Sequence, residues 1–359
     1  MPFQLEDYLS NGVERIVNGI LKASIHNPKE SIFMVKYAAS SRKARDKRKT
    51  EEANGEHIPP FLIASITEQC NLHCKGCYAR VNHPCSSYQL KASQWGGIFS
   101  QAADLGIGFI LLAGGEPFTR REVLEEAGRH KNILFPVFTN GTLLDEEYLK
   151  LFSACRNLIP ILSIEGGEDI TNKRRGDGVY ARLHRSMEML RKERLLFGAS
   201  VTVTKENLEE VTSDKFLRNL DDCGCKAVIY VEYVPADRRT ATLAPDEEDR
   251  KFLDQRLQEL RNGQENLLFI SFPGDEKTSG GCLAAGRGFF HINAAGGAEP
   301  CPFSPYSDTN LLHTPLKEAL HSPLFLKLQK EGMLLKEHVG GCVLFEQEQQ
   351  VKAYLEEIR

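Results

Sequence analysis

The chain has 359 residues, of which 41% are hydrophobic and 26% charged, and its formal net charge is -4. These proportions are ordinary for globular proteins and give no sign of a disordered, fibrous or membrane-spanning chain. At roughly 150 residues per domain, the length predicts about two structural units, or one barrel with an appendage. The small negative charge gives no global reason to expect a nucleic-acid-binding protein.

The first residues and the cysteine content predict where the protein works. Glu6 and Asp7 stand where a signal peptide would carry basic residues, and no apolar run approaches the roughly 20 residues of a membrane helix. We therefore expect a cytoplasmic protein. Because cytoplasmic thiols are kept reduced, its 10 cysteines indicate metal ligation or redox chemistry rather than a disulfide framework.

Residues 1–60 are predicted to form a helical lead-in that is amphipathic over residues 13–21. A run of six basic residues then occupies positions 42–49. We interpret this run as a solvated helix face; docking to an acidic partner, to an anionic membrane surface or to RNA is the alternative. Pro59 and Pro60 close the segment, because neither suits a helix interior.

From residue 61 to about 240, short apolar runs alternate with longer amphipathic ones. The apolar runs predict six strands, at 61–67, 108–113, 134–139, 158–165, 197–204 and 227–234. The amphipathic runs predict helices that include 89–105, 143–152 with Thr142 as a candidate N-cap, 180–194 and 208–220. Six strand–helix units in series indicate a parallel sheet. We therefore predict an α/β fold, a partial (β/α)6 TIM-like barrel with its chemistry at the carboxyl ends of the strands.

Residues 241–359 break this alternation. A charged helix near 245–262 is followed by a region rich in Gly and Pro, with a hairpin-like segment at 289–299. This region also carries Cys282, Cys301 and Cys342. We predict a smaller C-terminal unit, so that the chain divides into a lead-in at 1–60, a barrel at 61–240 and a C-terminal extension at 241–359.

The strongest chemical signal is a loop after the first strand that holds Cys70, Cys74 and Cys77. Three thiolates can hold an iron–sulfur cluster and leave one iron open to a ligand, as a catalytic metal keeps an open position. The alternative is a zinc knuckle, but zinc sites usually need four protein ligands in paired spacings, and His73 would have to turn outward from the same tight loop. The loop therefore predicts an oxygen-sensitive 4Fe–4S cluster.

The spacing Cys70-x3-Cys74-x2-Cys77 resembles the signature of radical S-adenosylmethionine (SAM) enzymes. The resemblance covers about residues 61–235 and again the C-terminal cysteines. It implies that the amino and carboxylate groups of SAM chelate the open iron, and that one electron from the reduced cluster releases a 5′-deoxyadenosyl radical. It also implies an electron donor such as flavodoxin or ferredoxin.

The residues that follow the second strand resemble the GGEP motif of the same family, which lines the amino group of SAM. They are Gly114, Gly115, Glu116 and Pro117. Glycines let the backbone approach a ligand closely, and the Glu116 carboxylate with the strand-end carbonyls supplies acceptors for an ammonium group.

Other strand-end residues resemble further SAM-binding positions of the family. Asn140 matches a recurrent position after the third strand, with a simple turn asparagine as the alternative. Ser163 and Glu165 match the segment that contacts the ribose, although Asp is more usual than Glu there. Arg175 matches an arginine that meets the SAM carboxylate. For Arg174 we expect a surface salt bridge.

One residue departs from the family pattern. Gly76 stands before the third cysteine, where the family usually has an aromatic residue that contacts adenine. We expect Tyr78 to substitute for it, or the contact to be made by the backbone alone.

The C-terminal cysteines, with Cys301-Pro302 and the hairpin before it, resemble the SPASM or twitch extension of radical SAM enzymes. The resemblance implies one auxiliary iron–sulfur cluster held by Cys282, Cys301 and Cys342, with its last site open or filled by another group. The alternative is three unligated thiols in a Gly-rich cap. We leave the other four cysteines out of the site: Cys85, Cys155, Cys223 and Cys225.

The predicted function is reductive SAM cleavage followed by hydrogen abstraction from an organic substrate. We favour a role in cofactor or small-molecule biosynthesis, or a dehydrogenation, and peptide or protein modification by the same chemistry is the alternative. A second alternative, a non-catalytic iron–sulfur electron carrier, leaves the residues 114–117 and Ser163 unexplained.

Overall fold

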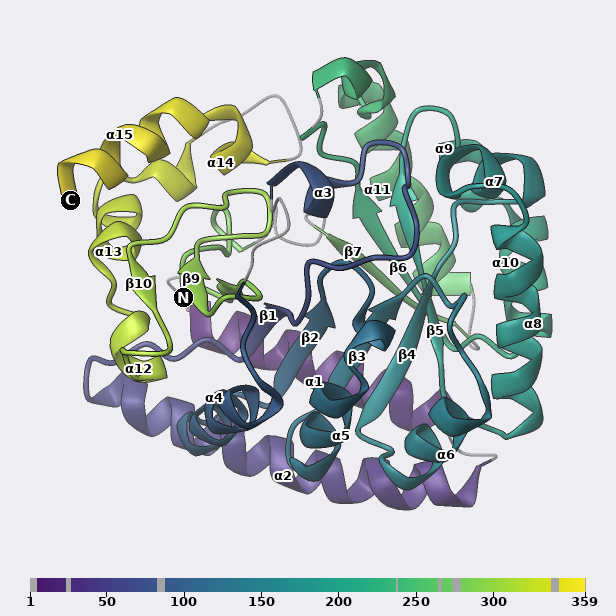
Figure 1. Cartoon of the computed structure of the whole chain (residues 1–359), viewed down its shortest axis with the longest axis horizontal. Helices are drawn as coiled ribbons and strands as arrows, with labels where there is room; N and C mark the ends of the chain where they lie inside the picture. Colours follow the sequence, from purple (N-terminus) through teal and green to yellow (C-terminus); the bar gives the residue numbers. More distant parts are fainter. Residues whose placement is uncertain are drawn as a thin grey trace.

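A computed structural model describes residues 5–23, 27–82, 88–236, 238–263, 267–272, 279–336 and 342–358 of the chain. Its centre is a curved parallel sheet with helices outside it (Figure 1). The parallel strands follow one another as β1 (Phe61–Ser65), β2 (Phe109–Ala113), β3 (Phe135–Thr139), β4 (Leu158–Ser163), β5 (Gly198–Val203), β6 (Ala227–Glu232) and β7 (Leu268–Phe272). The helices between them are α3 (Tyr78–Asn82), α4 (Ala92–Leu105), α5 (Arg121–Arg129), α6 (Glu146–Ala154), α7 (Glu168–Arg175), α8 (Val179–Lys192), α9 (Leu208–Val211), α10 (Asp214–Asp222) and α11 (Glu247–Gly263).

The α/β class and the partial barrel are confirmed, and the sheet is not closed. The prediction of six parallel strands is wrong, because β7 pairs in parallel with β6, from Ala227 opposite Leu268 to Val231 opposite Phe272. In the sequence this strand is a short apolar run between a charged helix and a Gly- and Pro-rich region. Periodicity alone does not identify so short a run as a strand.

Two predicted helix boundaries are corrected by the side chains that cap them. Asp145, rather than Thr142, is the N-cap of α6, since its carboxylate accepts a hydrogen bond from the Tyr148 amide at 2.9 Å. The predicted helix 208–220 is two helices, because Ser213 interrupts it and caps α10 through the Phe216 amide at 3.2 Å. The structure also gives the bounds of α5 and α7, which the helix ranges named from the sequence did not include.

The predicted lead-in consists of two helices, α1 (Leu5–Ala23) and α2 (Pro28–Ala53), which cross the amino-terminal ends of the strands (Figure 1). Val17 of α1 belongs to the same buried cluster as Phe109 and Ile159, at the starts of β2 and β4. The Tyr37 hydroxyl of α2 donates to the Gly108 carbonyl just before β2, at 2.6 Å. The lead-in therefore closes the end of the barrel opposite the cysteine loop.

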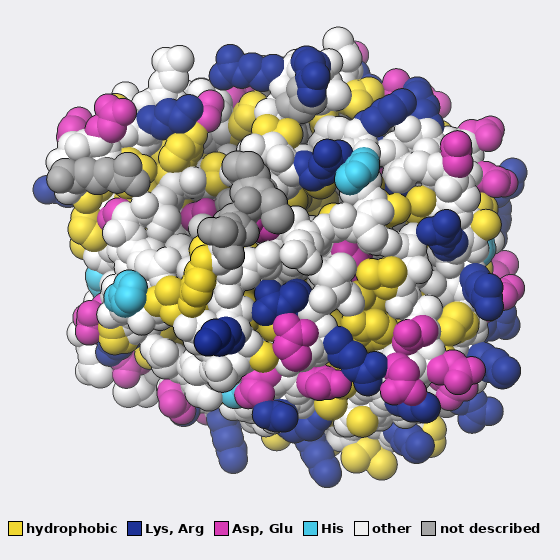
Figure 2. Space-filling model, viewed as in Figure 1, with side chains coloured by type: hydrophobic (Ala, Val, Ile, Leu, Met, Phe, Trp, Pro, Cys, Tyr) yellow, Lys and Arg dark blue, Asp and Glu magenta, His cyan; other side chains and the backbone are white. Residues whose placement is uncertain are grey.

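Half of the basic run on α2 is neutralised by α1. Three ion pairs join the two helices: Arg45–Glu14, Arg48–Glu6 and Lys49–Asp7. The remaining members, Arg42, Lys43 and Lys47, are exposed. Figure 2 shows Lys and Arg side chains projecting along the edge of the molecule where α2 runs. The interpretation as a solvated face thus holds for only part of the run.

The C-terminal residues extend the same sheet. Its strand order is β10-β9-β8-β1-β2-β3-β4-β5-β6-β7. The new elements are β8 (His291–Ile292), β9 (Gly297–Glu299), β10 (Thr309–Asn310), α12 (Leu316–Ala319), α13 (Pro323–Lys330), the 3-10 turn η4 (Met333–Leu335), α14 (Val343–Glu346) and α15 (Glu348–Ile358). The predicted hairpin is confirmed, since β8 and β9 pair antiparallel, and β8 also pairs in parallel with β1. Within the described ranges, no helix has the length and apolar character to cross a membrane.

Candidate functional site

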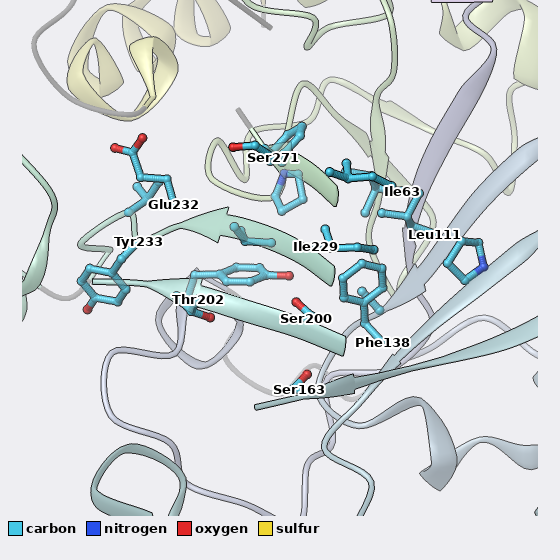
Figure 3. A pocket seen from close by; sticks show the side chains of 18 of the residues that line it. Ile63, Leu111, Phe138, Ser163, Ser200, Thr202, Ile229, Glu232, Tyr233 and Ser271 are labelled. Atoms are coloured by element: carbon cyan, nitrogen blue, oxygen red, sulfur yellow. The ribbon is translucent and has the colours of Figure 1, made fainter. Parts of the chain in front are cut away.

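A cavity of about 890 Å³ lies inside the barrel. The cysteine loop and the carboxyl ends of the strands line one end of it, and α1 lines the other. Figure 3 shows the side chains of several strands directed into this space. Ten of the predicted site residues line the cavity: Cys70, Cys74, Cys77, Tyr78, Gly114, Gly115, Glu116, Asn140, Ser163 and Arg175.

The three loop cysteines are close enough to affect one another's ionisation, since the charges of Cys74 and Cys77 both raise the pKa of Cys70. Burial is the largest cause, and it raises the pKa of the Cys70 and Cys74 thiols. The nearby guanidinium groups lower the pKa of Cys74 but do not offset its burial. Thiols of raised pKa become thiolates when iron takes the place of their protons.

Three thiols of one loop line the cavity, which is the ligand set that the predicted cluster needs. Within the described residues, no three His, Cys, Asp or Glu side chains are grouped so that they could hold one metal ion. A 4Fe–4S cluster does not require that convergence, because each thiolate binds a different iron. The cysteine loop, which lines the cavity with three thiols, therefore fits the predicted cluster.

The two glycines of the GGEP segment have a structural role that the sequence did not indicate. A Cβ added to Gly114 would lie 2.2 Å from the Thr67 carbonyl oxygen, and one on Gly115 would lie 2.1 Å from that of Gln69. The Gly115 amide donates to the Thr67 carbonyl at 2.7 Å. The glycines thus let the start of the cysteine loop run directly against the end of β2.

Glu116 joins the ends of β2 and β3. It is only 1% exposed, and its carboxylate accepts hydrogen bonds from the Asn140 and Phe118 amides and from the Thr139 hydroxyl, at 2.7, 3.0 and 2.7 Å. Burial raises the pKa of Glu116, while these three donors oppose the rise. Pro117 is buried and does not line the cavity.

Asn140 connects β3 to the cysteine loop. Its side-chain amide donates to the Asn71 side chain at 2.9 Å and lies 3.9 Å from the Cys70 sulfur. Its carbonyl oxygen accepts from the amide and hydroxyl of Thr142. Asn140 therefore does form a turn, as the alternative held, and it also supports the loop that carries the first thiol.

Glu165, Arg174 and Arg175 form a buried charge cluster beside the cysteine loop. One oxygen of Glu165, whose side chain is 0% exposed, accepts from Arg174 at 2.5 Å and from Arg175 at 2.7 Å. The expected surface salt bridge of Arg174 is wrong, because its side chain is 15% exposed and lines the cavity. Glu165 does not line the cavity; it lies behind the two arginines.

This cluster has more positive than negative charge. It also contains two buried polar atoms without a hydrogen-bond partner among the described residues. One carboxylate faces two guanidinium groups, and Glu165 Oε2 and Arg174 Nε have no hydrogen-bond partner in the described structure. Burial alone lowers the pKa of Arg175, but the charges of Glu165 and Cys74 raise it above its usual value. Such a site is suited to an anionic ligand.

Sequence reasoning missed several cavity residues that adjoin Ser163. Ser200 on β5 stands opposite Ser163 in the sheet register, and Thr202 lies two residues further along the same strand. Figure 3 shows the three hydroxyl side chains on neighbouring strands. The signal was available, because Ser200 and Thr202 are alternate polar residues in an apolar strand and so share one face.

The ring beside Gly76 comes from Tyr233, just after β6. A Cβ on Gly76, whose φ is +63°, would lie 2.0 Å from the Tyr233 hydroxyl oxygen. The Tyr78 ring instead packs edge-on against Phe303 of the C-terminal unit, with centroids 5.0 Å apart. Both tyrosines line the cavity, but Tyr233 occupies the space that a side chain at position 76 would need.

The three C-terminal cysteines belong to or pack against the main buried core, and none of the nine described cysteines forms a disulfide. Cys301 is buried and follows the β8–β9 hairpin, while Cys342 begins α14. The amide of Cys282 donates to the Leu334 carbonyl at 2.8 Å. Tyr78 lies near both Cys77 and Cys301, because their charges each raise its pKa, after burial as the main cause. Cys85 lies outside the described residues.

Comparison with known proteins agrees with this geometry. Residues 64–217 match the Radical SAM superfamily. The chain is 27% identical to the AdoMet-dependent heme synthase of Methanosarcina barkeri, over 79% of this chain and 88% of that protein. It is 24% identical to the antilisterial bacteriocin subtilosin biosynthesis protein AlbA of Bacillus subtilis, over 85% and 71%. Among solved structures, Streptococcus suis SuiB bound to S-adenosylmethionine has a TM-score of 0.65 at 18% identity, over 84% of this chain and 74% of SuiB.

Proposed function

We propose that the chain, whose residues 64–217 match the Radical SAM superfamily, cleaves SAM reductively and abstracts hydrogen from an organic substrate held in the barrel. The observation that carries this proposal is that three neighbouring thiols, a buried carboxylate and a paired-arginine cluster line one end of a single cavity. A protein that only carries electrons has no need of the last two features.

Cys70, Cys74 and Cys77 are the proposed ligands of the catalytic cluster. When bound, the cluster supplies the electron for SAM cleavage to the 5′-deoxyadenosyl radical. Asn140, 3.9 Å from the Cys70 sulfur, steadies the loop that presents these thiols.

Opposite charges orient the amino-acid end of SAM in this proposal. The Glu116 carboxylate attracts the ammonium group in its ionised form, which its three hydrogen-bond donors favour against the effect of burial. Arg174 and Arg175 attract the carboxylate, with Glu165 fixing both guanidinium groups. Ser163, now with Ser200 and Thr202, supplies hydroxyls for the ribose. Tyr233 rather than Tyr78 forms the aromatic wall beside Gly76.

Cys282, Cys301 and Cys342 are proposed to hold one auxiliary iron–sulfur cluster. Supporting this, the turn after Cys301 contacts α3, which directly follows the catalytic loop: the Asn82 side chain donates to the Pro302 carbonyl at 3.0 Å. An auxiliary cluster in this place would lie beside the catalytic loop, where it could accept an electron from the substrate.

We propose a small molecule as the substrate, in keeping with the similarity to a heme synthase across most of both chains. Peptide modification is the second candidate, and the similarity to a protein of bacteriocin biosynthesis favours it. The two differ in where the substrate would sit, since a small molecule fits inside the cavity and a peptide must keep its flanking residues outside.

The central test is SAM turnover by anaerobically reconstituted protein. With dithionite and SAM, wild-type protein is expected to form 5′-deoxyadenosine, and Cys74→Ala is expected to form none. Cys155→Ala serves as the matched control, because this cysteine ends α6 outside the cavity and should leave turnover intact. Full turnover by Cys74→Ala would refute the assignment.

The auxiliary cluster is tested by iron and sulfide content together with Mössbauer spectra. Cys282→Ala should lose the iron of about one cluster while the spectrum of the catalytic cluster keeps its response to SAM. Unchanged iron content in this variant would remove the auxiliary site from the proposal.

A further inference from the structure

The inner face of the barrel is more accessible than its outer face. Along β6, residues Ala227, Ile229 and Val231 are partly exposed, whereas the residues between them are buried beneath the outer helices. The strand β7 alternates in exposure as well, with Leu268, Ile270 and Phe272 as its accessible members, and its buried residues Phe269 and Ser271 also line the cavity. Closed barrels of this kind fill their interior with side chains. This barrel is hollow instead.

The hollow continues beyond the predicted SAM site to the opposite end of the barrel. We call this part the inner chamber; it is lined by Gly12 of α1 and by Ile63, Leu111, Phe138, Ile229 and Ile270 of the strands. Figure 3 shows Ile63, Leu111, Phe138 and Ile229 gathered on one side of the pocket, with Thr202 and Tyr233 on the other side. The walls are apolar, and apolar surface is stabilised when a ligand removes it from water.

Gly12 indicates that this space is kept open on the side of α1. Glycine inside a helix is unfavourable relative to alanine. At Gly19 in the same helix the reason is packing, since a Cβ there would lie 3.0 Å from the Leu268 side chain. At Gly12 a Cβ would meet nothing within 4 Å, although the residue lines the cavity. No neighbour in the described structure therefore requires glycine at this position.

A positive charge stands at the edge of the inner chamber. Arg15 lies three residues after Gly12 on α1, so the two share a helix face, and Arg15 also lines the cavity. The side chain is exposed, and within the part of the chain that the structure describes it takes part in no ion pair. An acidic group at the end of an apolar molecule would find its counter-charge here.

We propose that the inner chamber is the substrate site, and that the substrate has an apolar body that reaches α1 and an acidic group that pairs with Arg15. This inference rests on the proposed radical function and names the class of molecule that the function would act on. A molecule of this kind would lie between α1 and the SAM-binding residues, with the strands β1, β2, β3, β6 and β7 around its apolar body.

Two probes with the same aromatic body test the proposal. 8-Anilinonaphthalene-1-sulfonate carries an acidic group, and N-phenyl-1-naphthylamine lacks it. Binding to full-length, cluster-loaded protein is measured by anaerobic equilibrium dialysis. Gly12→Leu should weaken the binding of both probes by about tenfold or more, because the new side chain fills the chamber. Arg15→Ala should weaken the binding of the sulfonate probe by about threefold or more and leave the binding of the neutral probe unchanged.

The control is Gly97→Leu in α4, another helical glycine whose Cβ would meet nothing within 4 Å but which does not line the cavity. It should bind both probes as wild type does. If Gly12→Leu does not fold, Ile229→Phe on β6, which also lines the chamber, replaces it, with the same expected loss. Unchanged binding in the chamber variant, or an equal loss in Gly97→Leu, would overturn the proposal.

The proposed function is measured separately, as 5′-deoxyadenosine formed by wild-type protein without a substrate. If wild-type protein turns over SAM but Gly12→Leu binds both probes as wild type does, the inner chamber is rejected as the substrate site and the radical chemistry is retained. Absence of SAM turnover with the expected probe losses would reject the radical chemistry and leave an apolar binding chamber.

Discussion

Two arginines share one buried carboxylate oxygen in this protein, and neither could be given that role from its position alone. Arg174 and Arg175 are adjacent in a helix, so one of them would ordinarily point to solvent. Both reach Glu165 because α7 ends beside the cysteine loop, where the Arg174 carbonyl also accepts from the Lys75 amide at 2.9 Å. The cavity wall therefore carries two guanidinium groups where one was expected.

Glu165→Gln removes the charge that both guanidinium groups share and keeps the shape of the side chain. Breaking a buried ion pair on one side costs about 3 kcal/mol or more, so we expect the free energy of unfolding to fall by about 3 kcal/mol. Urea denaturation measures the change. Glu206→Gln is the control, because Glu206 pairs with Lys173 at an exposed site and should change stability by less than about 0.5 kcal/mol. Equal effects in the two variants would contradict this account.

A side chain at position 76 would need the volume that the Tyr233 ring occupies. Substitutions of Gly76 and Tyr233 should therefore have non-additive effects on the free energy of unfolding. Gly76→Ala adds a Cβ in a left-handed conformation, which costs about 1 kcal/mol, and also collides with the Tyr233 hydroxyl. In the double variant Gly76→Ala/Tyr233→Leu the collision is removed. We expect the double variant to be more stable than the sum of the single losses by about 1 kcal/mol, measured by urea denaturation. Additive losses would show that the two residues do not interact.

At the scale of the element, one buried histidine fastens the C-terminal hairpin to the barrel. His291 of β8 is fully buried, with one ring nitrogen 2.7 Å from Ser65 Oγ on β1 and the other 2.7 Å from Glu299 Oε2 on β9. The resemblance to a hydrolase triad has no catalytic meaning here, because all three residues are buried and none lines the cavity. The network fixes the hairpin that precedes Cys301 against the first strand.

His291→Leu is expected to loosen this junction. The substitution leaves the Glu299 carboxylate and the Ser65 hydroxyl short of a buried partner, at a cost of about 2 kcal/mol. Hydrogen exchange locates the effect: the Ile63 amide, which donates to the Phe290 carbonyl at 3.1 Å, should exchange faster. The Leu268 amide at the far edge of the sheet should keep its protection. Equal acceleration at both amides would indicate global rather than local loss.

At the scale of the whole molecule, the basic run and the cysteine loop lie at opposite ends of the barrel. The exposed members of the run sit on α2, which covers the amino-terminal ends of the strands (Figure 1). Other exposed basic residues, Lys75 and Arg80, lie within or just after the cysteine loop. An acidic electron donor that docks near the cluster would therefore meet the second group, and the first group would contribute little to reduction.

Charge reversal at each end tests this expectation. Lys75→Glu/Arg80→Glu should slow reduction of the reconstituted protein by reduced flavodoxin by about tenfold at low salt, and added salt should shrink the difference. Arg42→Glu/Lys43→Glu should stay within about twofold of wild type. Stopped-flow absorbance measures both rates. A larger effect from the α2 pair would place the donor at the other end of the molecule.

The sequence by itself determined the features that depend on neighbours along the chain. Three cysteines within one short loop define a ligand set whatever the rest of the fold does, and the apolar runs that precede Cys70 and Gly114 predicted strands ending at one edge of a parallel sheet. Local spacing carries this information because loop ligands and strand ends are set by a few consecutive residues.

Only the tertiary structure decided what fills the space between distant segments. It brought Tyr233 over Gly76, buried Arg174 against Glu165, added β7 to the sheet and set Gly12 of α1 at the far end of the cavity. Each of these depends on which surfaces pack together and how much volume remains between them. Packing and burial are properties of the assembled fold, so no pattern within a single segment contains them.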